Sequence, residues 1–196
     1  MSDFYRIVEM PVKQGMEVFP DFQVVKSKDF MIRGGKFYAV WDPETDLWCT
    51  EEYRVKELVD ADVRKHVELL GDIPGFAIKG RYMTNDSSGV WTKYRKYVNN
   101  LPDNFHQLDA KLTFSDTKVE KKDYVSKRLP YALKEGSHEA WDEMIGTLYL
   151  PEEREKIEWA IGAVVSGDSR TIQKFLVFYG DPGTGKGTIL YIIKEY

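Results

Sequence analysis

The chain has 196 residues, of which 42% are hydrophobic and 31% charged, a balance typical of a folded globular protein rather than a disordered one. Its net charge of -4 excludes nucleic-acid binding through overall charge, and its one cysteine, Cys49, excludes an internal disulfide and a cysteine-rich zinc site. Because no membrane-length apolar run or signal peptide is visible, we expect a cytoplasmic protein without membrane contact.

The first 50 or so residues alternate apolar and polar positions between turn signals, which predicts a β-meander. Gly34-Gly35 and the polar run from Asp42 to Asp46 are the turns. The predicted strands include Val18–Pro20, Phe22–Val25, Phe30–Ile32, Lys36–Trp41 and Leu47–Cys49.

An amphipathic helix is predicted to follow and to cover the sheet. Thr50 is its expected N-cap, and Gly71 ends it. One apolar stripe at helical spacing is formed by Val55, Leu58, Val59, Val63, Val67 and Leu70.

A strand is predicted at Phe76–Ile78, and a second helix from about Ser88 to Val98. This helix interleaves aromatic residues with Lys93, Arg95 and Lys96, a mixture found where proteins bind single strands. An aromatic stripe at helical spacing more often packs against a sheet, so we favour core packing, with the basic side chains left free to meet DNA. The run from Asn99 to Asp103 is the predicted domain boundary.

Charge changes along the next part of the chain, because basic residues outnumber acidic ones between Trp91 and Arg128 while acidic residues dominate from Leu129 to Asp168. A short strand is predicted at Leu112–Phe114, and two helices begin near Ser137 and Pro151. The residues expected to face inward are Trp141, Met144, Ile145, Leu148, Ile157, Trp159, Ala160, Ile161, Val164 and Val165.

The most informative motif follows the apolar run Phe175–Tyr179, which predicts a buried parallel strand. Glycines let the backbone after it form a concave turn whose N–H groups bind phosphate, and Lys186 begins a helix whose positive end favours the same anion. The residues predicted to bind ATP are Gly180, Asp181, Pro182, Gly183, Thr184, Gly185, Lys186, Gly187 and Thr188.

The motif departs from the usual form after its lysine, where Gly187 replaces the hydroxyl residue that ligates Mg²⁺. Thr188 offers the next hydroxyl, for a phosphate or for Mg²⁺ held through water. Only eight residues follow Thr188, and they supply no acidic strand or arginine for phosphoryl transfer, although Ile189, Leu190, Ile192 and Ile193 predict a buried helix face. We therefore expect an N-terminal fragment that hydrolyses nothing alone.

Other metal and catalytic clusters are not predicted. His66, His106 and His138 are scattered without the spacing of metal ligands, and we expect surface or hydrogen-bonded roles for them. The catalytic residues stay unassigned.

Residues from about Leu112 to Leu190 resemble the phage and large-DNA-virus primase-helicases of helicase superfamily 3, which are AAA+ type ATPases. The resemblance lies in Phe114-Ser115-Asp116, Ser126–Tyr131, Trp141, Ile157–Gly162 and the run from Phe175 to Thr188. It implies ATP and Mg²⁺ as cofactors, a helical collar, and a homo-oligomeric ring that moves single-stranded DNA inside an infected host cell. No primase cluster of carboxylates with a histidine is visible in the first 110 residues.

Three regions are therefore expected: an α+β N-terminal domain over residues 1–102, a connector and helical collar over 103–168, and the start of an α/β P-loop ATPase core over 169–196. The leading hypothesis is the N-terminal part of an ATP-dependent replicative DNA helicase. One alternative is a nucleoside monophosphate kinase, whose loops also carry GKGT but near their N-terminus. Another is a non-catalytic module that binds DNA or a replication partner and keeps a vestigial loop.

Overall fold

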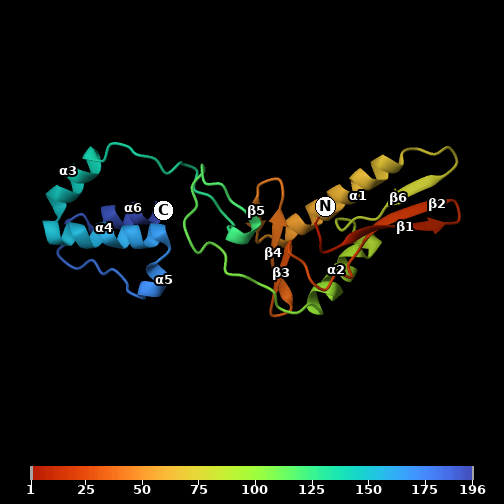
Figure 1. Ribbon diagram of the computed structural model, residues 1–196, viewed down its shortest axis with the longest axis horizontal. Helices are drawn as coiled ribbons and strands as arrows, with labels where there is room; N and C mark the ends of the chain where they lie inside the picture. Colours follow the sequence, from red (N-terminus) through yellow and green to blue (C-terminus); the bar gives the residue numbers. More distant parts are fainter. Residues whose placement is uncertain (1, 196) are drawn as a thin grey trace. The chain divides into compact units, whose positions relative to one another are not determined.

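The computed structural model describes residues 2–195, which form a mixed α+β fold with two small sheets (Figure 1). The chain divides into two compact units. The first runs to Leu108 and takes in Val119–Ser126, whereas the second takes in Asp109–Lys118 and the chain from Lys127 onward.

The first sheet of the first unit has the strand order β1-β2-β6. Its strands are β1 (Arg6–Val12), β2 (Gly15–Asp21) and β6 (Ala77–Gly80). β1 and β2 form an antiparallel hairpin, and β6 pairs in parallel with β2. A Cβ atom at Gly15 would lie 2.0 Å from the carbonyl oxygen of Ala77, so this close pairing requires glycine there.

The second sheet is an antiparallel meander, with the order β3-β4-β5. Its strands are β3 (Phe30–Arg33), β4 (Lys36–Asp42) and β5 (Leu47–Cys49). Gly34 and Gly35 join the first two with φ values of 60° and 67°, the left-handed conformation that a two-residue hairpin turn demands.

The strands predicted at 30–32, 36–41 and 47–49 are confirmed, as is the strand near 76–78. The single meander over residues 1–50 is wrong, because β1 and β2 belong to a separate sheet completed by β6. Residues 22–25 form no strand.

Two helices cover these sheets, α1 (Glu52–Leu70) and α2 (Val90–Asn99), with a short 3₁₀ turn at Asp86–Ser88 between them. Gly71 ends α1 as predicted, but its N-cap is Glu51 rather than Thr50. The α1 stripe buries Val55, Val59 and Val63, and α2 buries its aromatic face, which confirms core packing for that helix.

The main core lies where α1 and α2 meet the strands, and Phe4 stacks on Phe30 within it at 4.4 Å between ring centroids. Its buried members are Phe4, Tyr5, Phe30, Ile32, Val40, Val55, Val59, Met83, Val90, Tyr94 and Val98. Because successive side chains of a strand point to opposite faces, Met31, Ala39 and Trp41 belong to a second cluster, with Trp48 and Leu108.

The segment 119–126 is hydrogen-bonded to β5 through Trp48, a member of this second cluster. Its 3₁₀ turn spans Lys121–Asp123. The Trp48 indole N–H donates to the Lys121 carbonyl at 2.9 Å, and the Trp48 backbone N–H donates to Val125 at 2.8 Å.

The second unit is helical, and the residues it buries most are Ile145, Ile157 and Ile189. Its helices are α3 (Glu139–Leu148), α4 (Pro151–Ser166), α5 (Ser169–Ile172) and α6 (Lys186–Glu195). Arg154 on α4 links to α3 through Asp142 and bonds Glu158 at 2.8 Å, while the Trp141 indole donates to the same carboxylate at 2.8 Å.

Two predictions for this unit are wrong. Leu112–Phe114 is not a strand, although the Leu129 N–H donates to the Thr113 carbonyl at 2.7 Å. Most of the α4 face predicted to be buried is not, since Trp159 is 55% exposed and Val164 41%. Among the described residues, the neighbours of α4 include α3, the short α5, α6 and the 174–179 segment, which bury Ile157 but not the whole stripe.

Candidate functional site

Residues 180–185 form a turn that leads into α6, whose first residues, 186–188, complete the predicted loop. Gly180, Gly183 and Gly185 have φ values of 144°, 81° and 78°, which side-chain-bearing residues rarely adopt. At Gly185 a Cβ would also lie 2.5 Å from Leu148 Cδ1. These three glycines therefore allow the backbone conformation of the turn, as the sequence predicted.

Lys186 directs its ammonium back across this turn. Its Nζ donates to the carbonyl oxygens of Gly180 and Asp181 at 3.0 and 2.5 Å, and to the Thr184 hydroxyl at 3.0 Å. The Thr184 hydroxyl itself donates to Asp181 at 2.9 Å. These oxygens hold a full positive charge inside the loop, where it is placed to meet an anion.

The first turn of α6 closes the other side. The N–H groups of Thr188 and Ile189 donate to the Gly185 carbonyl at 3.1 and 3.2 Å. Buried Ile189 packs with Ile145 and Ile157 in the isoleucine core of this unit and so anchors the helix. The helix therefore presents its positive end at Lys186. Asp181, Pro182, Gly187 and Thr188 are exposed around it.

A hollow of about 440 Å³ adjoins the loop. Gly180, Thr184 and Lys186 line it together with residues that the sequence analysis did not select, namely Leu148, Tyr149, Glu153, Lys156, Ile157, Leu176, Val177, Phe178 and Tyr179. Those from α4 and the end of α3 precede the loop with no motif spacing, so only the fold brings them to it.

Tyr149 is the most distinctive of these lining residues. Its hydroxyl is buried and has no hydrogen-bond partner among the described residues. Burial, and then the negative charge of Glu153, raise the pKa of Tyr149, so the hydroxyl stays a neutral donor at neutral pH. The ring packs edge-on to Phe178, with centroids 6.4 Å apart.

The strand predicted at Phe175–Tyr179 is not formed. The segment has no regular secondary structure, and Phe175 and Tyr179 are 88% and 99% exposed. A strand exists only when a neighbour accepts its backbone hydrogen bonds, and no other strand within residues 2–195 pairs with this one. Of the segment 175–179, only Phe178 packs against the isoleucine core.

Metal ligation is not built into the described residues, where no three His, Cys, Asp or Glu side chains cluster to hold an ion. His66 contacts Glu9 at 2.7 Å, His138 contacts Asp142 at 2.5 Å, and His106 stacks on Tyr124.

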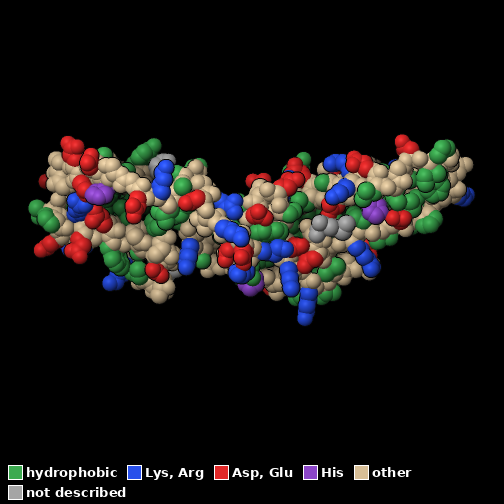
Figure 2. Space-filling model, turned by 45° about the horizontal axis from the view of Figure 1, so that its top comes forward, with side chains coloured by type: hydrophobic (Ala, Val, Ile, Leu, Met, Phe, Trp, Pro, Cys, Tyr) green, Lys and Arg blue, Asp and Glu red, His purple; other side chains and the backbone are tan. Residues whose placement is uncertain are grey.

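The basic side chains of α2 are the sequence-predicted candidates for DNA contact, and all three are exposed. Arg95 is paired with Glu52 at 2.7 Å, and Lys93 lies over the Phe19 ring at 5.3 Å. Figure 2 shows acidic side chains gathered over α3 and α4 of the second unit, with both signs of charge mixed on the first unit. The α2 cations are therefore few and partly engaged.

Comparison with protein-family models finds no match, and neither the curated proteins nor the solved structures include one significantly similar to this chain. Across the part of the chain that the structure describes, no helix has the length and apolar character needed to cross a membrane.

Proposed function

We propose that residues 180–188 bind the phosphates of a nucleoside triphosphate, ATP with Mg²⁺, and that this binding powers a DNA-translocating motor of the superfamily 3 type. The observation that carries the proposal is the Lys186 ammonium held within 3.0 Å of three oxygens of a glycine-shaped turn at the start of a helix. Backbone N–H groups, a fixed cation and a helix terminus together provide the donors that a triphosphate needs.

The Lys186→Ala variant tests the loop. We expect it to weaken binding of a fluorescent ATP analogue by about 100-fold, because a charge-assisted contact of about 3 kcal/mol is lost. Lys194→Ala, in the last turn of the same helix, is the matched control and should bind normally. Equal affinities for the two variants would show that the loop is structural.

The helicase part of the proposal rests on the sequence resemblance and on the apolar surface of the helical unit. Trp159 and Val164 are exposed on α4 and Leu150 lies just before it, in a position suited to contacts between subunits of a ring.

ATP turnover with and without single-stranded DNA separates the candidate functions, and sedimentation velocity of the same samples reports assembly. Assembly that ATP drives supports the motor, and binding without turnover agrees with the expectation that this chain hydrolyses nothing alone. Turnover that DNA stimulates would support the motor but contradict that expectation. Phosphate transfer to AMP or CMP would instead identify a nucleoside monophosphate kinase, the alternative that the GKGT run favours. Because turnover is not expected of either, ATP binding without ATP-driven assembly would favour the non-catalytic module.

A further inference from the structure

A second hollow, of about 420 Å³, lies wholly within the first unit, away from the phosphate-binding loop in sequence. The segments that form it are the loop before β3, the chain after α2 and the turn 119–126. Its lining consists of Ser27, Lys28, Met31, Trp48, Asn104, His106, Lys121, Lys122 and Tyr124. Three lysines and three flat rings thus surround one opening.

The rings form a contiguous stack. Tyr124 lies within 15° of parallel to His106 with ring centroids 4.2 Å apart, and on Trp48 with centroids 6.0 Å apart and an interplanar angle of 30°. Trp48 is buried and fixed by its two hydrogen bonds to segment 119–126, whereas His106 is exposed. The outer face of the imidazole therefore ends a rigid stack at the surface, where a further aromatic ring can extend it.

The backbone of Tyr124 has an unfavourable conformation in this arrangement. Its φ of 52° is left-handed, a conformation that tyrosine rarely adopts and that clusters at ligand-binding positions. The turn just before it is held by two hydrogen bonds, from the Glu120 N–H to the Asp123 carboxylate at 2.7 Å and from the Asp123 N–H to the Glu120 carbonyl at 2.9 Å. The same turn brings Lys121 and Lys122 beside the stack.

The three lysines of this hollow differ in whether they form ion pairs with acidic residues. Lys121 is paired with buried Asp29, and exposed Lys122 is paired with Glu120 at 2.7 Å, a surface pair that water weakens. Lys28 is exposed and has no ion-pair partner among the described residues. Lys28, with Lys122 beside it, can therefore meet an incoming anion without losing a buried partner.

We propose that this hollow binds a nucleotide unit, with the base stacked on His106 and the phosphate on Lys28 and Lys122. Stacking surfaces beside exposed cations match the two parts of a nucleotide, and they accept any base because every base has a π face. The unit is either a free nucleotide or one link of a single strand. A duplex is excluded because its bases are already stacked on one another.

The test uses the Lys186→Ala chain, so that the phosphate-binding loop contributes nothing to binding. Fluorescence anisotropy of a labelled thymidine oligomer of about 12 nucleotides, a length that one small domain can cover, measures the affinity. Unlabelled dTMP, oligomer and duplex serve as competitors.

Adding His106→Ala should weaken oligomer binding about 10-fold, within the range of one lost base stack. Adding Lys28→Gln should weaken it about 3-fold and reduce the slope of log affinity against log salt by about 0.7, one phosphate contact. Matched controls on α1 are Tyr53→Ala, an exposed aromatic residue, and Lys65→Gln, an exposed lysine, and both should leave binding unchanged.

If dTMP competes as well as the oligomer per site, the ligand is a free nucleotide; if the oligomer competes far better, it is a single strand. The proposal is overturned if the starting chain binds neither, if duplex competes equally, or if the His106 and Lys28 variants bind like their controls. Because Lys186 is already removed, none of these results depends on ATP binding at residues 180–188.

Discussion

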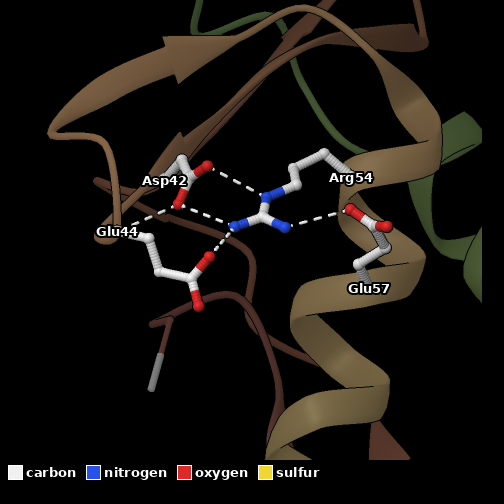
Figure 3. A network of polar contacts seen from close by, with 4 residues as sticks. All are labelled: Asp42, Glu44, Arg54 and Glu57. Carbon is white, nitrogen blue, oxygen red and sulfur yellow. Dashed lines mark hydrogen bonds and ion pairs between the residues drawn. The ribbon is translucent and has the colours of Figure 1, made fainter.

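A single side chain, that of Arg54, connects three acidic residues in the first unit. It lies at the start of α1 and faces carboxylates from Asp42, Glu44 and Glu57 (Figure 3). Its guanidinium bonds Asp42 at 2.9 and 3.2 Å and Glu57 at 3.0 Å, and it also pairs with Glu44. The bidentate contact ties the end of β4 to the helix.

The electrostatics of Asp42 give a test with a defined sign. Burial on its own would raise the pKa of Asp42, but hydrogen bonds from Arg54 and from the Glu44 N–H outweigh it and lower the pKa overall. A lowered folded-state pKa means that this stabilisation is present above the unfolded value, near pH 4, and is lost as pH falls through the folded value.

Arg54→Ala should therefore lower the free energy of unfolding by about 2 kcal/mol at about pH 7, since it leaves a buried carboxylate without its cation. The difference from the native chain should shrink as the pH falls below about 4 and through the lowered folded-state pKa of Asp42, where the carboxylate becomes protonated. Urea unfolding over a series of pH values measures it. Arg6→Ala, which breaks an exposed pair with Asp21, should cost less than 1 kcal/mol, and equal costs for the two variants would contradict this account.

At the scale of elements, α1 is bonded to its surroundings as well as packed against them. Asp60 is fully buried on its apolar face, where its carboxylate accepts from the N–H groups of Met83 and Thr84 at 2.6 and 3.1 Å and from the Thr84 hydroxyl at 2.6 Å. On the same helix, Asp62 accepts from the Tyr5 hydroxyl at 2.5 Å. These bonds fix the N-terminal segment and the chain after β6 onto α1.

Asp60→Ala should destabilise the first unit by about 3 kcal/mol, because the buried Met83 N–H would lose its acceptor and Thr84 would lose both of its hydrogen bonds to the carboxylate. Asp60→Asn should recover part of this loss, since its amide oxygen can still accept. Glu68→Ala, at an exposed position of the same helix, controls for helix propensity. Denaturant unfolding followed by tryptophan fluorescence reports the change, and a loss below about 1 kcal/mol for Asp60→Ala would mean that water replaces the carboxylate.

Elements whose pattern reflects their burial were predictable from the sequence. α1 follows a clear helical period, β3 to β5 are short apolar runs between turn signals, and the loop at 180–188 was identifiable because its glycines and lysine lie close together in the sequence. β1 was missed because its residues are mostly exposed, without an inward-facing alternation. The Phe175–Tyr179 strand was predicted from composition alone, but a strand depends on a partner that composition does not reveal.

The rest could not be predicted because it depends on contacts between residues that are far apart in the sequence. Asp60 lies in an apolar stripe, and nothing local indicates the N–H groups of Met83 and Thr84 that make its burial favourable. His106 was expected to be unremarkable, and its contact with Tyr124 depends on the turn 119–126 returning to the first unit. The histidine has no spacing signal for such a partner, so the second hollow emerges only from the fold.

At the scale of the whole molecule, the two units differ in the size of their cores. The first has an aromatic-rich core sandwiched between helices and sheets, whereas the most buried residues of the second are three isoleucines. Because hydrophobic stabilisation scales with the apolar area buried, the first unit should be the more stable. Each unit holds its own candidate site, so each ligand should stabilise its own unit.

Heating should therefore give two unfolding transitions, of which only the lower one responds to ATP with Mg²⁺. A ligand at 100 times its dissociation constant adds about 2.7 kcal/mol to the unit that binds it, a rise of roughly 10 to 20 °C for a unit of this size. Differential scanning calorimetry measures both transitions, and Lys186→Ala should abolish the shift while leaving the upper transition in place. A single cooperative transition, or an equal rise of both, would show that the units unfold together and that binding energy reaches the first unit as well.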